Sequence, residues 1–205
     1  MGDFTVGVDL GQSCDSTAVA ILQEQQGTPP TFDCVHLERV PLGASYPAVV
    51  QRVWQIMQHP TLRGAALAID STGVGRPIFD LLQQAGLSPT AITITSGNEV
   101  TEKDGRYGVP KRDLIGAAQI LVQSHRLRIA KSLPEAETLI KELLNFQIKI
   151  TVNGGDQYGA WRSGTHDDMV LALSLAAWYA TAAPGHISGG WQRFAQAAMV
   201  RGGVR

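Results

Sequence analysis

The order of apolar segments along the chain limits the folds that it can adopt. Three segments near the N-terminus have the length and composition of β-strands, and they run from Phe4 to Leu10, from Thr17 to Gln23 and from Val35 to Leu42. A short Gly/Ser/Asp connection joins the first two, which indicates a hairpin. Strand and helix patterns alternate after them. The order predicts an α/β fold with a mixed central sheet and helices on both faces.

The alternating part of the chain supplies the remaining elements. Apolar residues at helical spacing predict helices over 46–58, 77–85, 111–125, 134–146 and 166–183, and short apolar runs predict strands at 66–70, 91–95 and 148–152. Residues 96–109 hold charges and turn residues, and we expect an ordered but mobile excursion there. The last helix is almost wholly apolar after two acids, so it is expected in the core. We therefore expect one domain over residues 1–183 and a basic tail over residues 184–205.

Composition excludes several classes of protein. The chain has 205 residues, of which 44% are hydrophobic and 17% charged, as in a packed domain. Two cysteines exclude a disulfide framework and a zinc-ligand pattern. No apolar run reaches the roughly 18 residues of a membrane span. We therefore expect a soluble protein of the cytoplasm without membrane contact.

Charge is distributed unevenly although the formal net charge is only −1. Residues 1–38 contain acids but no Lys or Arg, whereas most of the charged residues in 103–131 are basic. Such asymmetry is typical of a polyanion groove beside an acidic centre, and equally of solvated faces that cancel. Four basic residues are candidates for phosphate contacts, with solvated surface charge as the alternative: Lys111, Arg112, Arg126 and Arg128.

Acidic residues at the ends of predicted elements carry the functional hypothesis. Asp9 lies in the otherwise apolar first strand, where a carboxylate must be paired, protonated or bound to a metal. Asp70 ends the strand at 66–70, and Asp167 and Asp168 open the last helix. Chemistry in α/β sheets collects at the carboxyl ends of strands. If the two strands are neighbours, Asp9 and Asp70 face one crevice that the helix start can close.

Converging carboxylates repel one another, so such a crevice predicts a divalent cation. Oxygen ligands without a His/Cys cluster favour Mg²⁺ or Mn²⁺ over zinc. Two such ions would activate water and stabilise the leaving oxygen in phosphodiester cleavage. Each acid also has a structural alternative. Asp167 or Asp168 can cap the helix, Asp70 can cap the turn that follows it, and Asp9 can be a core acid bonded to the backbone.

Four stretches of the chain resemble the nuclease domain of phage terminase large subunits, in the same order and at similar spacing. They are VGVDLGQSCDSTAVAIL, AIDSTGVGRPIFDLL, GVPKRDLIGAAQILVQSHRLRI and SGTHDDMVLALSLAAW. The resemblance covers about residues 4–182 and implies an RNase H-like, RuvC-type fold. By the same likeness Asp9 is the first-strand metal ligand, Asp70 the second acid and Asp168 the helix ligand. Asp167 would then be a second or alternative ligand.

The resemblance also implies an activity and partners. Terminase nucleases cut concatemeric DNA during viral genome packaging with divalent ions, so double-stranded DNA is the expected substrate. A packaging ATPase domain, a small terminase subunit and a portal are the implied partners, in the cytoplasm of the host cell. The sequence contains no GxxxxGK[ST] motif. An isolated nuclease domain or a stand-alone relative is therefore expected, without ATP hydrolysis by that route.

Three other functions stay open on the sequence. VGVDLGQSCDSTAVAIL also resembles the first phosphate loop of actin/hexokinase-like phosphotransferases, although that architecture needs two lobes and this length offers one. A Holliday-junction resolvase shares the expected fold but is usually smaller, more basic and dimeric. A nucleic-acid-binding module that has lost its activity is the third, and the intact acids argue against it.

Overall fold

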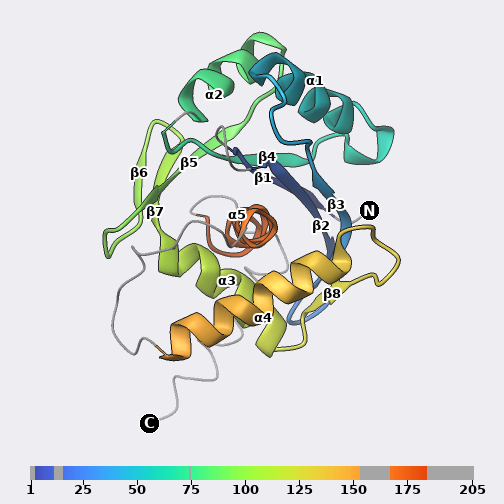
Figure 1. The fold of residues 1–205 in the computed structure, drawn as a ribbon, viewed down its shortest axis with the longest axis vertical. Helices are drawn as coiled ribbons and strands as arrows, with labels where there is room; N and C mark the ends of the chain where they lie inside the picture. Colours follow the sequence, from blue (N-terminus) through green and yellow to red (C-terminus); the bar gives the residue numbers. More distant parts are fainter. Residues whose placement is uncertain (1–2, 12–15, 74, 153–166, 184–205) are drawn as a thin grey trace.

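The structure, a computed structural model, describes residues 3–11, 16–73, 75–152 and 167–183, and for residues 145–152 only the helical backbone. Its centre is an eight-stranded mixed sheet in the order β6-β7-β5-β4-β1-β2-β3-β8 (Figure 1). The strands are β1 Phe4–Asp9, β2 Ala18–Gln25, β3 Thr31–Arg39, β4 Ala66–Asp70, β5 Thr90–Thr95, β6 Thr101–Lys103, β7 Arg106–Pro110 and β8 Leu127–Ile129. The expected tail over 184–205 lies outside the described residues.

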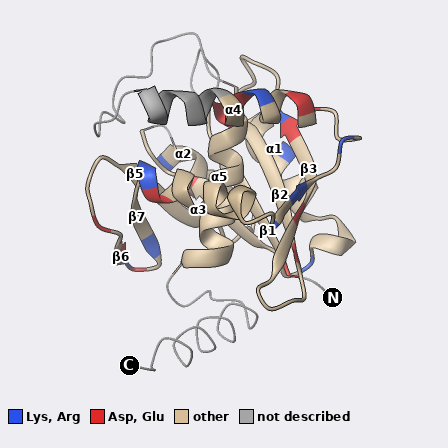
Figure 2. Ribbon diagram, turned by 90° about the horizontal axis from the view of Figure 1, so that it is seen from below, with Lys and Arg blue, Asp and Glu red and all other residues tan. Residues whose placement is uncertain are grey.

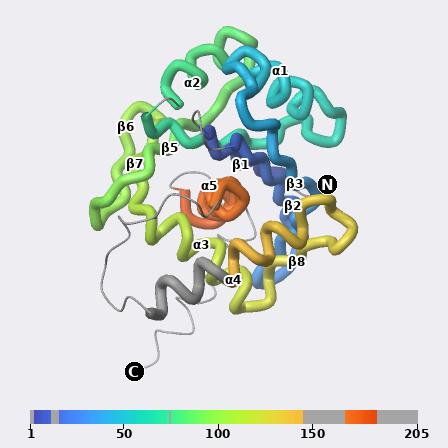
Figure 3. Tube along the Cα trace, in the orientation of Figure 1, coloured from blue at the N-terminus to red at the C-terminus, as the bar shows by residue number. Residues whose placement is uncertain are grey.

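Helices cover both faces of the sheet, as the sequence predicts. They are α1 Tyr46–Met57, α2 Gly75–Gln84, α3 Lys111–Gln123, α4 Ala136–Val152 and α5 Asp168–Ala182, with a 3₁₀ turn at Pro60–Leu62. Helices α1 and α2 lie on one face and α3, α4 and α5 on the other, and the Cα trace in Figure 3 shows the same three layers. No helix of the described residues is long and apolar enough to cross a membrane.

The first three strands form an antiparallel meander. β1 pairs with β2 and β2 with β3, which confirms the expected hairpin order. β3 begins at Thr31, however, and not at Val35 as predicted. A register shift opposite Ile21 and Leu22 places Val35 in a bulge, so that Cys34 and Leu37, three residues apart, enter the same core cluster. The bulge breaks the simple alternation and hides the start of the strand from a pattern search.

A further prediction was wrong, and one pair of strands was not predicted. Residues 148–152 continue helix α4 and do not form a strand. Their β-branched residues have only slightly lower helix propensity, and no Gly or Pro stops the preceding helix, so helix propagation continues. Residues 96–109 contain the antiparallel pair β6 and β7, and β7 adds in parallel to β5. Charged residues and a turn at the sheet edge concealed this pair.

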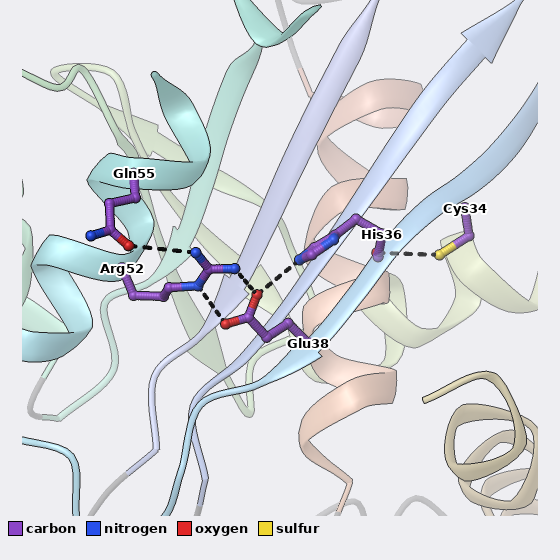
Figure 4. A network of polar contacts seen from close by, with 5 residues as sticks. All are labelled: Cys34, His36, Glu38, Arg52 and Gln55. Atoms are coloured by element: carbon purple, nitrogen blue, oxygen red, sulfur yellow. Dashed lines mark hydrogen bonds and ion pairs between the residues drawn. The ribbon is translucent and has the colours of Figure 1, made fainter. Parts of the chain in front are cut away.

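A polar network ties α1 to the sheet (Figure 4). Arg52 of α1 donates two hydrogen bonds of 2.6 Å to the Glu38 carboxylate on β3, and the His36 ring lies 3.0 Å from the same carboxylate. The hydrogen bonds from Arg52 lower the pKa of Glu38. Burial raises the pKa of the nearby Cys34 thiol to about 12, so this cysteine is inert as a nucleophile.

Helix α5 forms the centre of the core on its face of the sheet. Its residues are buried almost all round, as its near-continuous apolar sequence predicts, and they pack against strands and helices together. Gly7 on β1 makes the closest approach possible, because a Cβ at this position would overlap the Ala172 carbonyl and crowd Ala176 of α5. The helix therefore lies directly on the backbone of β1.

Substitution of Gly7 tests this packing. We expect Gly7→Ala to lower the free energy of unfolding by about 3 kcal/mol or more, because the added methyl meets backbone atoms that cannot move aside. Gly116→Ala is the matched control. Gly116 lies within α3, and a Cβ at this position would have no neighbouring atom within 4 Å outside the helix's own backbone. The control should gain about 0.5–1 kcal/mol from helix propensity. Urea unfolding measures both, and equal stabilities of the two variants would contradict the close contact.

Candidate active site

Two of the predicted acids lie side by side at the end of the sheet. β1 and β4 are parallel neighbours, with Val8 opposite Ile69, so Asp9 and Asp70 end adjacent strands at the same edge. Asp9 is 7% exposed, and Asp70 is partly buried. Short apolar strands with a terminal acid thus place two carboxylates at the carboxyl ends of central strands, where α/β folds bind their ligands.

The start of α5 brings the other two acids to the same place. Ala172 of α5 lies on Gly7, two residues before Asp9, and Asp168 is one turn earlier on the helix. The Asp9 carboxyl experiences the negative charges of Asp70, Asp168 and Asp167, which places all four acids in one electrostatic neighbourhood. The start of α5 therefore lies close enough to the two strand ends for the charges of its acids to act on Asp9.

Burial raises the pKa of both strand acids, Asp9 and Asp70. The pKa of Asp9 lies well above its ordinary value because the side chain is removed from water, and the charges of Asp70, Asp168 and Asp167 raise it further. Burial also raises the pKa of Asp70, and hydrogen bonds from Thr72 oppose that shift. The positive charge of Lys111 lowers the pKa of both acids. The site has a surplus of negative charge that a cation would relieve.

Two cations from other elements meet the helix acids. Lys111 at the start of α3 places its Nζ 3.4 Å from Asp167 Oδ2, and Arg39 at the end of β3 places its Nε 3.4 Å from Asp168 Oδ2. Arg39 also donates a hydrogen bond of 2.6 Å to Glu142 Oε1 on α4. Within the described ranges, no three His, Cys, Asp or Glu side chains are grouped so that they could hold a metal ion together.

Sequence reasoning missed Arg39 and Glu142. Glu142 is 8% exposed, and burial raises its pKa to about 7 despite the opposing effect of Arg39. A signal for it exists, because Glu142 follows the buried Leu139 by one turn and so lies on the apolar stripe of a helix. An acid on such a stripe needs a partner. Nothing in the sequence pairs it with Arg39, which is distant along the chain.

The structural alternative, a local capping role, holds for one of the predicted acids and not for another. Asp167 is the residue before α5, but its side chain makes no capping hydrogen bond; Glu142 Oε2 instead accepts one from the Val170 backbone N–H at 3.3 Å. Asp70 does act locally, since its Oδ1 accepts a hydrogen bond of 2.8 Å from the Thr72 backbone N–H. The capping explanation thus applies to Asp70 and not to Asp167.

The four predicted phosphate-binding residues are not all brought together. Lys111 begins α3 beside Asp167, whereas the next residue, Arg112, donates to the Asn98 carbonyl at 2.8 Å and pairs with Asp113. Arg126 and Arg128 follow the far end of α3, about 20 Å away along the helix. Arg126 is buried and donates to the Pro30 carbonyl, and Arg128 pairs with Asp33. Figure 2 shows the basic residues spread over several elements.

The order of the strands, with an antiparallel meander, parallel strands beyond it and helices on both faces, is that of the RNase H-like fold. No protein-family model matches the chain, and no curated protein matches it either.

Solved structures of terminase nucleases share this fold. The large terminase nuclease from thermophilic phage G20c is 22% identical, and the match covers 85% of this chain and 81% of that chain with a TM-score of 0.59. The same nuclease with bound magnesium is 22% identical, and the match covers 86% of this chain and 80% of that chain with a TM-score of 0.59. The human cytomegalovirus terminase nuclease domain soaked with manganese is 16% identical, with 86% and 83% covered and a TM-score of 0.52. The chain has the RNase H-like fold that these nuclease domains share.

The pKa of Asp9 predicts a pH-dependent stability for the metal-free protein. Because the pKa of Asp9 is higher in the folded state than in the unfolded state, the protonated acid stabilises the fold at low pH. This stabilisation is lost as the pH rises through the folded-state pKa. We therefore expect Asp9→Asn to melt at a higher temperature than the wild type at pH 8 in EDTA, with a smaller difference near pH 4. Differential scanning calorimetry measures both.

The exposed Asp80 of α2 provides the control for that experiment. Asp80→Asn should change the free energy of unfolding by no more than about 0.5 kcal/mol at either pH, as surface substitutions generally do. An Asp9→Asn protein that melts below the wild type at pH 8 would show instead that Asp9 is a structural acid whose ionised form stabilises the fold.

Proposed function

We propose that this chain is a metal-dependent DNA endonuclease of the terminase type. The observation that carries the proposal is that Asp9 and Asp70 end adjacent parallel strands of an RNase H-like fold, where burial raises the pKa of Asp9 and the charges of Asp70, Asp168 and Asp167 raise it further. Buried acids that repel one another are unfavourable for a fold and are typical of sites with a chemical role. The likeness in fold to two terminase nucleases supports the DNA substrate.

The chemistry of the donors suits a divalent ion, although no three of the described acids are already grouped around one metal position. Carboxylate oxygens are hard ligands, and their surplus of negative charge suits Mg²⁺ or Mn²⁺. Asp9, Asp70 and Asp168 would hold the metal, two ions in our proposal, with Asp167 as a second or alternative ligand. When bound, the ions supply charge that activates water and stabilises the leaving oxygen of a phosphodiester. Similar structures carrying magnesium and manganese support this choice of metals.

The chain's own residues would prepare the site for that chemistry. Lys111 lowers the pKa of Asp9 and Asp70, so it favours the ionised carboxylates that a cation needs. Arg112, next to Lys111 at the start of α3, would contact the phosphate backbone of DNA without reading its sequence. Binding would then depend on salt, because each phosphate contact releases counterions.

A role in packaging follows from the same likeness. Terminase nucleases act on viral DNA, so we propose concatemeric double-stranded DNA as the substrate and genome packaging in the host cytoplasm as the setting. A packaging ATPase, a small terminase subunit and a portal are the partners that this setting requires.

Plasmid cleavage tests the activity. Supercoiled plasmid is incubated with the protein in Mn²⁺, Mg²⁺ or EDTA, and nicked and linear products are measured over time. We expect cleavage with either metal and none with EDTA. Asp9→Asn and Asp70→Asn should each lower the rate by about a hundredfold or more, since loss of an outer partner alone typically costs 10–100-fold.

The Asp80→Asn variant again serves as the control, with cleavage at the wild-type rate. Cleavage that persists in EDTA or in both ligand variants contradicts the proposal. The same proteins discriminate the other functions: turnover of ATP without cleavage would identify a phosphotransferase, and cleavage confined to four-way junctions would identify a resolvase.

Salt dependence tests the contact of Arg112 with DNA. We expect Arg112→Gln to weaken binding of a DNA duplex about three- to tenfold at low salt and to reduce the slope of log K against log salt by about one. Fluorescence anisotropy in Ca²⁺ or EDTA measures both. Arg63→Gln is the control, because Arg63 is exposed before the opposite end of β4; an equal loss in both variants would exclude a local contact.

A further inference from the structure

We propose that Arg39 and Glu142 form a positioning pair that fixes the Asp168 carboxylate for the divalent ion, an inference that rests on the proposed function. Neither residue belongs to the acidic cluster itself. Both contact the first turn of α5, Arg39 through the Asp168 carboxylate and Glu142 through the Val170 backbone N–H.

Strand register places Arg39 on the same side of the sheet as the acids. Asp9 pairs with Ala18 on β2, and Ala18 pairs with Arg39 on β3, so the three residues form one row across the sheet. Residues in one row direct their side chains to the same face. Ala18 belongs to the cluster that packs on α5. Asp9 and Arg39 therefore flank a small residue on the face that α5 covers.

Asp168 contacts the Arg39 end of this row. Its Oδ2 lies 3.4 Å from Arg39 Nε, and its side chain is 5% exposed. This contact is an ion pair and not a hydrogen bond. A buried carboxylate beside a guanidinium is restrained by the opposite charge, as outer partners restrain the ligands of metal sites. Arg39 thus acts on Asp168 without itself being a ligand, because a cation cannot coordinate a metal ion.

Glu142 makes this arrangement compatible with a divalent ion. An uncompensated guanidinium near the site would repel Mg²⁺ or Mn²⁺, but Arg39 Nη2 donates to Glu142 Oε1 at 2.6 Å, so the ionised form of Glu142 offsets the charge of Arg39. Glu142 Oε2 also accepts the Val170 backbone N–H at 3.3 Å. One carboxylate therefore binds both the guanidinium and the first turn of the helix that carries Asp168.

The second contact of Glu142 takes the place of a capping hydrogen bond from Asp167. A helix start needs acceptors for its first backbone N–H groups, and an Asp before the helix usually provides one. Here Glu142 from α4 provides it, and Asp167 makes no capping bond. Asp167 and Asp168 are paired with Lys111 and Arg39, which come from other elements.

Binding of Mn²⁺ to the DNA-free protein tests the pair. Free Mn²⁺ is measured by electron paramagnetic resonance during titration at pH 7.5. We expect Arg39→Gln to raise the dissociation constant about tenfold or more, the range for outer partners of a metal site. Glu142→Gln should weaken binding as well, because it can still accept from Val170 but no longer offsets the charge of Arg39. Arg39→Lys should fall between Arg39→Gln and the wild type.

Arg52→Gln is the matched control. Arg52 also pairs with a glutamate at 2.6 Å, and that glutamate, Glu38, precedes Arg39 on the same strand. Its variant should bind Mn²⁺ within about twofold of the wild type. Circular dichroism and urea unfolding establish that each variant is folded, and if Arg39→Gln does not fold, Arg39→Lys and Glu142→Gln carry the comparison.

Cleavage as a function of Mn²⁺ separates positioning from general damage. In Arg39→Gln the Mn²⁺ concentration for half-maximal cleavage should rise by the same factor as the dissociation constant, and the rate at saturating Mn²⁺ should stay within about threefold of the wild type. Equal or tighter Mn²⁺ binding by Arg39→Gln overturns the inference even if the wild type cleaves DNA. A wild type that binds Mn²⁺ with these ratios but cuts no DNA overturns the nuclease proposal alone.

Discussion

The close contact between α5 and β1 is the constraint on which the rest of the structure depends. Gly7 leaves no side chain between the strand and the backbone of Ala172 and Ala176, so the helix axis is held against the centre of the sheet. A buried helix this close cannot shift along the strand without a clash. Its first turn is consequently fixed at the end of β1, and Asp168 is fixed beside Asp9. The same contact that closes the core therefore sets the geometry of the acids.

Holding four acids together has an electrostatic cost that neighbouring elements reduce only in part. Lys111 comes from α3 and Arg39 from β3, and each lies 3.4 Å from one helix acid. The pKa of Asp9 stays raised all the same, because burial and the three other carboxylates outweigh the single lysine. A protein that needed only stability would replace such acids with neutral residues. The retained repulsion is the strongest physical argument that the site serves a function.

The sequence predicted the elements that burial dictates, and failed where local chemistry competes with pattern. β1, β4 and α5 have simple apolar patterns ended by acids, so their places and the acids on them could be inferred. The bulge in β3 broke the alternation, and the β-branched residues at the end of α4 suggested a strand where a helix continues. The sequence could not indicate that Arg39 and Glu142 meet, because their contact is made only in the folded chain, where α4 packs against α5.

The acidic cluster is assembled from opposite ends of the described chain. Asp9 and Asp70 lie on strands made early in synthesis, whereas Asp167 and Asp168 arrive with the last described helix. Chains emerge from the ribosome N-terminus first. A nascent chain that has not yet released α5 lacks half of the cluster and the central helix of the core as well. The packing on β1 and the gathering of these four acids therefore both wait for the same late segment of the chain.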